Sequence, residues 1–177
     1  MLDVFVNDIG IRLDVDLRLD SQKTGAPDLS SYGISRTQQG YDAKVDDSNL
    51  KNKTKMKETL EDIMKSVVKG EPVYIHCSVG ADRTGYVCLL IEALLGVRQN
   101  ACDTDFEMSS FTTKITSTPR LRTKPVSGGT YSGCIQNLAK FNGSTVGEKA
   151  YDYIVTSSNG LGINADLVEQ FRAKMIQ

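Results

Sequence analysis

Residues 73–91 change from one hydrophobic pattern to another within a few positions. The run from Val73 to Ile75 is typical of a buried strand, and the run from Tyr86 to Ile91 is typical of a buried helix. The polar decapeptide from His76 to Gly85 stands between them. Because both apolar runs have to be covered by other elements, a strand, a tight loop and a helix in this order favour an α/β layer structure.

The decapeptide reads His-Cys-Ser-Val-Gly-Ala-Asp-Arg-Thr-Gly, and it can enclose an anion. The first N–H groups of a helix have no partner within the helix, the helix dipole adds positive potential, and successive loop N–H groups form a nest around an oxyanion. A glycine gives the loop conformational freedom, and the arginine guanidinium suits two phosphate oxygens. We expect phosphate to be bound by Ser78, Val79, Gly80, Ala81, Asp82 and Arg83.

Cys77 lies in the same positive field. A thiol at a helix N-terminus beside an arginine has a lowered pKa, so that its thiolate is a nucleophile at neutral pH. Thr84 is placed to donate a hydrogen bond to the sulfur. The predicted chemistry is attack of Cys77 on phosphorus, loss of an alcohol, and hydrolysis of the phosphocysteine by water. The alternative interpretation is a buried and inert cysteine, since free cysteines are often small core residues.

These residues resemble the active-site loop of the cysteine-dependent protein tyrosine phosphatase superfamily, His-Cys-x5-Arg-Thr-Gly. The loop is most similar to that of bacterial tyrosine phosphatases, which reads His-Cys-x-x-Gly-Lys-Asp-Arg-Thr-Gly. The resemblance implies a small central sheet that is flanked by helices. Weaker similarities are Asp16-Leu17-Arg18, the segment from Leu95 to Val97 with that from Glu107 to Phe111, and Gln170-Phe171-Arg172.

Two departures from that family concern the substrate and the extent of the chain. Ala81 stands where the family has a loop lysine, and the missing charge disfavours phosphoinositide substrates with a second phosphate. The chain also begins close to Asp16-Leu17-Arg18, where relatives carry additional N-terminal elements. We interpret residues 1–177 as a single phosphatase domain, either N-terminally shortened or a compact variant.

The general acid that protonates the leaving group has two candidate positions. The resemblance to the bacterial family favours Asp82, inside the loop. Other tyrosine phosphatases carry the acid on a separate loop upstream of the cysteine, where this chain has Asp46 and Asp47. Each candidate also has a structural interpretation, because Asp46 and Asp47 suit a helix entry and Asp82 can brace the loop by pairing with Arg83.

His76 is the only histidine of the chain, and it precedes Cys77 on the predicted strand. Successive strand side chains point to opposite faces, so we expect the His76 ring to face away from Cys77 and to hydrogen-bond the loop backbone. Residues 11–19 alternate between apolar and polar positions, which predicts another strand. Its polar face either meets solvent or ties neighbouring loops through Asp16 and Arg18.

The rest of the pattern predicts an α/β fold with a small sheet and a helix-rich C-terminal half. The turn-rich segments 21–31 and 112–129 are expected to be loops. Gly70 is expected to end the helix before the central strand, and Asn100 to cap the helix after residue 96. Strands are predicted at 11–19, 35–45 and 73–77, and helices at 54–69, 84–95, 100–111, 132–141, 146–157 and 164–176.

The composition is that of an ordinary globular protein of one domain, with 177 residues, 40% hydrophobic and 24% charged. The net charge of −1 gives no basic field for nucleic acid. The longest apolar run, from Val87 to Leu95, is too short to span a bilayer. The spacing of the four cysteines, at positions 77, 88, 102 and 134, matches neither a zinc site nor a disulfide framework, so no metal and no cofactor are expected.

The segment from Met1 to Asp8 has no basic stretch followed by an apolar one, so no signal peptide is visible. Since Cys77 must stay reduced for the proposed chemistry, we expect a cytoplasmic protein. If an export signal preceded Met1, the protein would be periplasmic or secreted.

The sequence therefore predicts a cysteine-dependent phosphomonoester hydrolase, foremost a protein tyrosine phosphatase, with dual specificity as a variant of that function. Its partner would be a phosphorylated protein or a small phosphomonoester. One alternative is another enzyme with a cysteine anion loop, a sulfurtransferase or an arsenate reductase. The other alternative is a phosphate-binding module that keeps the loop for recognition without catalysis.

Overall fold

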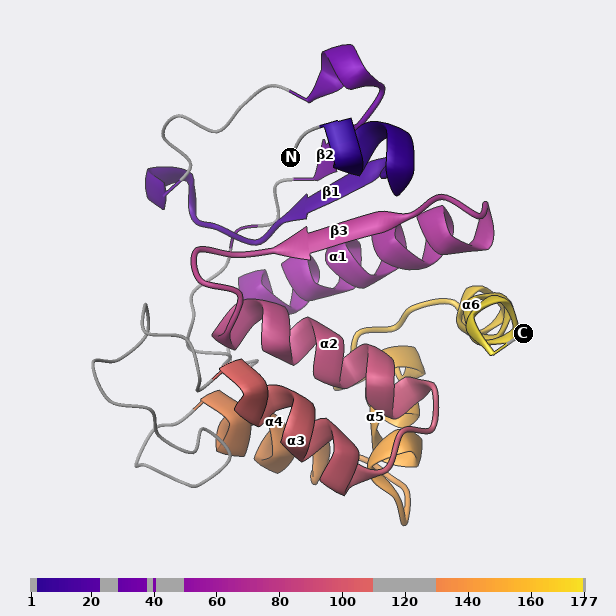
Figure 1. The fold of residues 1–177 in the computed structure, drawn as a ribbon. Helices are drawn as coiled ribbons and strands as arrows, with labels where there is room; N and C mark the ends of the chain where they lie inside the picture. The colour runs from indigo at the N-terminus through magenta and orange to yellow at the C-terminus, as the bar shows by residue number, and fades with distance from the viewer. Residues whose placement is uncertain (1–2, 23–28, 38–39, 41–49, 110–129, 177) are drawn as a thin grey trace.

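The computed structural model describes residues 3–22, 29–37, 40, 50–109 and 130–176, and these form an α/β fold (Figure 1). Its sheet has three short parallel strands in the order β2-β1-β3. β1 spans Leu13–Asp16, β2 spans Ser35–Thr37 and β3 spans Val73–His76. The register places Asp14 beside Arg36 on one side and Tyr74 on the other, and Asp16 beside His76.

Helices make up most of the described chain and dominate its C-terminal half (Figure 1). The α/β class with a small sheet and a helix-rich C-terminal half is therefore confirmed. The helical segments are η1 (Val4–Asp8, a π-helical turn), the 3-10 turns η2 (Asp20–Gln22) and η3 (Ser30–Tyr32), α1 (Leu50–Val68), α2 (Asp82–Leu94), α3 (Gln99–Met108), α4 (Thr130–Leu138), α5 (Val146–Val155) and α6 (Ala165–Met175).

Local capping explains where several helices begin. Thr145 and Glu148 form a capping box at the start of α5, and Asn164 accepts the N–H of Asp166 at the start of α6. The predicted cap at Asn100 is wrong. α3 begins one residue earlier, and its N-cap is Arg98, which has extended backbone angles and makes no side-chain cap.

The two faces of the sheet differ in chemistry. Val15, Val73 and Ile75 face the hydrophobic core with helices α1 and α2. Helix α2 lies at the centre of the molecule, with β3 on one side and α3 and α5 on the other (Figure 1). The opposite face of the sheet carries Tyr74, whose ring packs edge-on against Phe5 of η1. Helices α1 and α2 therefore cover one face of the sheet, and η1 contacts the other face through Phe5.

The position of β3 differs from the expectation, and the structure distinguishes the two alternatives for the polar face of β1. In the part of the chain that the structure describes, β1 is the central strand, whereas β3 is at the edge and its Val73 and Ile75 are half-buried. Exposure of the polar face of β1 to solvent is excluded, because Asp14 is 1% exposed and Asp16 is not exposed at all. The other alternative agrees with the structure, since Asp16 accepts hydrogen bonds from Arg18 in the following turn. Asp14 pairs with Arg36 and His76 on the neighbouring strands, and Asp16 pairs with Arg18 in the following turn, so that both carboxylates are buried with partners.

Other predicted segments agree in part or lie outside the described residues. The predicted strand at 11–19 is shorter than expected, and that at 35–45 is found as β2. The rest of the latter segment, 38–39 and 41–45, lies outside the described residues, as do positions 23–28 of the predicted loop at 21–31. The two ends of the predicted loop at 21–31 form η2 and η3. The predicted loop at 112–129 also lies outside the described residues.

Candidate active site

The loop between β3 and α2 is fixed at both ends by the backbone. The N–H of Leu17 donates to the carbonyl of His76 at 2.9 Å, and the N–H of Gly85 donates to that of Ala81 at the same distance. Gly80 has a φ of +70°, in the left-handed region that disfavours side chains. The predicted anion loop is therefore a compact turn that joins a parallel strand to the N-terminus of a buried helix.

Helix α2 begins without a side-chain cap. Its N-cap is Ala81, which is buried and has no polar side-chain atom to accept the first N–H groups of the helix. These groups have no partner within a helix and carry the positive end of its dipole. Their positive potential favours an acceptor that lies over the loop.

The Cys77 sulfur takes that position. Its side chain is buried, with 8% of the residue exposed. Burial raises the pKa of Cys77, but a hydrogen bond from the Thr84 hydroxyl and others from the N–H groups of Thr84, Val79 and Gly80 outweigh burial and lower the pKa to about 7. A large fraction of this thiol is therefore a thiolate at neutral pH.

Thr84 supports the sulfur with both its hydroxyl and its N–H. The hydroxyl oxygen is buried and has no partner of full hydrogen-bond geometry. The hydroxyl nevertheless acts on the sulfur, because it is among the groups that lower the pKa of Cys77. The predicted neighbourhood of Thr84 and Cys77 is thus present in the structure.

Arg83 is the second element of the site, and it is only 5% exposed. Its Nη1 donates to the carbonyl of Leu17 at 3.0 Å and to Oε1 of Gln22 at 2.9 Å, and its Nη2 donates to Oγ of Ser78 at 3.2 Å. The guanidinium is therefore held against the C-terminal end of β1. Gln22, which also accepts the N–H of Leu19, was not predicted from the sequence.

The remaining predicted residues are placed as follows. Ser78, Val79 and Gly80 are exposed at the turn of the loop. Asp82 is half-buried and is the first residue of α2, directly before Arg83. Asp46 and Asp47 lie outside the described residues, so the structure brings together Cys77, Arg83, Thr84 and Asp82 and leaves the choice of general acid a prediction.

A charged network lies behind the loop, on the polar face of the sheet. Arg36 Nε donates to Asp14 Oδ2 at 2.7 Å, and Asp14 Oδ1 lies 3.0 Å from His76 Nε2. The second contact lacks full hydrogen-bond geometry, and it is an ion pair when His76 is protonated. On the same face, Asp16 accepts Nε and Nη2 of Arg18 at 2.9 and 2.8 Å.

The His76 ring has the predicted orientation. It stacks on Tyr74, on the polar face of the sheet, and its Nδ1 lies 3.4 Å from the carbonyl oxygen of Cys77. The contact with Asp14 raises the pKa of His76 although burial opposes it. Sequence reasoning missed Asp14, which only the strand register brings beside the histidine.

Cys88 and Cys102 have raised pKa values, whereas that of Cys77 is lowered. Burial, together with the charge of Glu92, raises the pKa of Cys88 to about 11 and that of Cys102 to about 12. Neither thiol would be a thiolate at neutral pH. The electrostatic distinction between Cys77 and these two cysteines agrees with its role as the candidate nucleophile.

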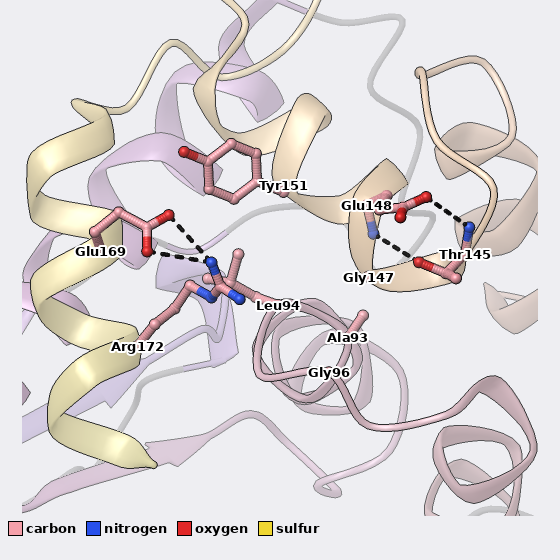
Figure 2. A pocket seen from close by; sticks show the side chains of 9 residues that line it. All are labelled: Ala93, Leu94, Gly96, Thr145, Gly147, Glu148, Tyr151, Glu169 and Arg172. Atoms are coloured by element: carbon pink, nitrogen blue, oxygen red, sulfur yellow. Dashed lines mark hydrogen bonds and ion pairs between the residues drawn. The ribbon is translucent and has the colours of Figure 1, made fainter. Parts of the chain in front are cut away.

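A cavity of about 340 Å³ lies at the opposite end of α2 from the loop, between α5 and α6 (Figure 2). Its walls hold the Glu169–Arg172 ion pair and Tyr151, over which the Arg172 guanidinium stands at 5.9 Å. These groups connect α6 to α5 and are not part of the candidate active site. Among the described residues, no group of three or more His, Cys, Asp or Glu side chains could hold a metal ion.

Comparison with known proteins gives one positive result. A family model with the description "Tyrosine phosphatase family" matches residues 2–177. No curated protein matches the chain. Within the described part of the chain, no helix has the length and apolar character needed to cross a membrane.

Proposed function

This chain belongs to the tyrosine phosphatase family, and from that premise we propose that it hydrolyses phosphate monoesters, foremost phosphotyrosine in proteins, through a phosphocysteine on Cys77. The observation that carries the proposal is the position of the buried Cys77 between β3 and the N-terminus of α2, with the Arg83 guanidinium held beside the loop by Ser78. The loop donors also lower the pKa of Cys77 to about 7 in spite of burial. Such a thiol supplies a nucleophile at neutral pH.

In the first step the Cys77 thiolate attacks phosphorus and forms a P–S bond. The P–O bond to the leaving group breaks, and its electron pair passes to the leaving oxygen, which takes a proton from the general acid. In the second step water attacks phosphorus and gives a proton to the conjugate base of that acid. The P–S bond breaks, inorganic phosphate leaves, and the thiolate is regenerated.

Arg83 and the loop N–H groups would stabilise the charge on the transferred phosphoryl group. The guanidinium is already held by Leu17, Gln22 and Ser78, so little reorganisation is needed when the substrate binds. The predicted phosphate ligands from Ser78 to Arg83 follow from this arrangement. Because Ala81 adds no charge to the loop, we propose substrates with a single phosphate.

We propose Asp82 as the general acid, with Asp46 and Asp47 as the alternative. Asp82 is the first residue of α2 and directly precedes Arg83 in the sequence. Asp82→Asn, Asp46→Asn and Asp47→Asn should be compared on aryl phosphates of high and low leaving-group pKa. The acid is the residue whose loss slows the poor leaving group more than the good one.

The decisive experiment measures aryl phosphate hydrolysis and its inhibition by vanadate for the wild type, Cys77→Ser and the control Cys88→Ser. We expect vanadate-sensitive turnover that is lost in Cys77→Ser and kept in Cys88→Ser. Turnover that survives in Cys77→Ser would exclude the phosphocysteine mechanism. Binding of a phosphopeptide without any wild-type turnover would instead indicate a recognition module, and a persulfide on Cys77 a sulfurtransferase.

A further inference from the structure

Three ionisable side chains, one from each strand, contact one another across the polar face of the sheet. Arg36 of β2 holds Asp14 of β1 at 2.7 Å, and Asp14 meets His76 of β3 at 3.0 Å. The strands lie side by side in this order (Figure 1). Asp14 is 1% exposed, so its charge has been taken out of water and depends on these two partners.

The His76 ring stands between two oxygen acceptors. Nε2 faces the Asp14 carboxylate at 3.0 Å, and Nδ1 faces the carbonyl oxygen of Cys77 at 3.4 Å. A neutral imidazole has one N–H and would turn a lone pair toward one of the two oxygens. The imidazolium has an N–H on each nitrogen, so it is the form that suits both neighbours.

We propose that Asp14 is a positioning residue that keeps His76 as an imidazolium behind the loop, so that the ring holds the Cys77 carbonyl and its charge supports the thiolate. This inference rests on the proposed function of Cys77 as the nucleophile. Asp14 does not touch the substrate. It acts through His76, and Arg36 fixes its carboxylate in the orientation that the ring requires.

The other groups near His76 do not change this assignment. Asp16 Oδ1 lies 3.9 Å from Nε2 and is itself engaged by Arg18, and Tyr74 stacks on the ring. Segment η1 packs on Tyr74 through Phe5, and its two acidic neighbours, Asp3 and Asp8, are exposed. The pKa of His76 is raised by Asp14 first, against the opposing effect of burial, and then by the charge of Asp16.

The chain offers a direct test, because it contains a single histidine. Titration of the imidazole by NMR therefore reports on His76 without assignment of other rings. We expect a wild-type midpoint above 6.5, the ordinary value, and protonation of both ring nitrogens below that midpoint. Asp14→Asn, which keeps the size of the side chain, should lower the midpoint, whereas the control Asp62→Asn on α1 should not.

The link to Cys77 is tested by the pH dependence of its alkylation with iodoacetamide. The wild-type midpoint is expected near 7, and it should rise in both Asp14→Asn and His76→Asn. If Asp14 acts through His76, the double variant should show no larger change than His76→Asn alone. If the shift of the midpoint in the double variant equals the sum of the shifts in the two single variants, Asp14 acts on the loop by a route other than His76.

A wild-type His76 midpoint at or below 6.5, or one that Asp14→Asn leaves in place, would overturn the inference. If Asp14→Asn does not fold, a wild-type His76 midpoint at or below 6.5 would still overturn the inference. Neither readout requires turnover. A protein that shows the expected midpoints but no aryl phosphate hydrolysis would contradict the proposed function and leave the role of Asp14 intact.

Discussion

The Arg83 guanidinium donates to the carbonyl oxygen of Leu17, 3.0 Å away, and so joins the loop after β3 to the end of β1. The partner is a backbone atom, which no substitution at position 17 removes. The orientation of this buried cation is therefore set by the parallel pairing of the two strands, and the site is assembled only when the sheet forms.

Arg83→Lys should reduce kcat for an aryl phosphate by about 100-fold or more, the usual cost of removing a preorganised donor to the transition state. Lysine keeps the charge but lacks the planar fork that reaches Leu17, Gln22 and Ser78 together. Steady-state kinetics measure the change. Arg98→Lys, on an exposed residue before α3, is the matched control, and a similar loss there would refute the assignment.

Gln22→Ala should reduce kcat about tenfold, because a hydrogen bond to a charged group is worth roughly 1.5–3 kcal/mol. Its Oε1 accepts from both Arg83 and the N–H of Leu19, so the variant loosens the guanidinium and the turn beside it. The effect should be smaller than that of Arg83→Lys. Kinetics indistinguishable from the wild type would show that Leu17 and Ser78 suffice.

A comparison of Gly80→Ala with Gly33→Ala distinguishes the destabilisation caused by backbone strain from an effect on turnover. Both glycines have φ near +70°, and a Cβ at either would meet no atom within 4 Å. Each substitution should therefore destabilise the fold by about 1–2 kcal/mol, as expected for a left-handed alanine. Denaturant unfolding should give similar losses, whereas turnover should fall only for Gly80→Ala, because only that residue lies in the loop.

Thr84→Val should raise the pKa of Cys77 from about 7 toward the ordinary 9.0, since the variant removes the hydroxyl that supports the thiolate and keeps the N–H. The rate of Cys77 alkylation against pH reports the midpoint. Thr104→Val, which removes an exposed hydroxyl bonded to the Asn100 carbonyl on α3, is the control. An unchanged midpoint in Thr84→Val would assign the lowered pKa to the backbone donors alone.

The lowered pKa of Cys77 also predicts how stability depends on pH. Because the folded value of about 7 is below the ordinary 9.0, the thiolate stabilises the fold fully above pH 9, and this contribution is lost as the pH falls through 7. Denaturant unfolding of the wild type and Cys77→Ser at several pH values should show a difference that grows from below pH 7 to above pH 9. A constant difference would contradict the lowered pKa.

The loop and its flanking elements could be predicted because their signal is local. A short apolar run, a decapeptide with glycines and an apolar helix follow one another from Val73 to Ile91, and each indicates its own structure. The residues missed depend on contacts between distant segments. Gln22 is 61 residues from Arg83, and Asp14 meets His76 only through the register of two parallel strands.

The prediction for β3 failed for a related reason. An apolar run such as that from Val73 to Ile75 suits a central strand and an edge strand equally well. Hydrophobicity alone does not show whether a strand pairs with other strands on one side or on both. The alternating pattern of β1 likewise identified the strand but not the environment of its polar face. Charged side chains are usually exposed, and their burial here depends on partners from β2, β3 and the turn after β1.

Because α2 begins without a side-chain cap, a bound anion can stabilise the start of this helix. In most helices a Ser, Thr, Asp or Asn oxygen completes the first turn, but Ala81 has none to offer. A phosphate or vanadate over the loop would complete that turn from outside the chain. Ligand occupancy and the integrity of the central helix are thereby linked, and the molecule should melt at a higher temperature whenever its loop is filled.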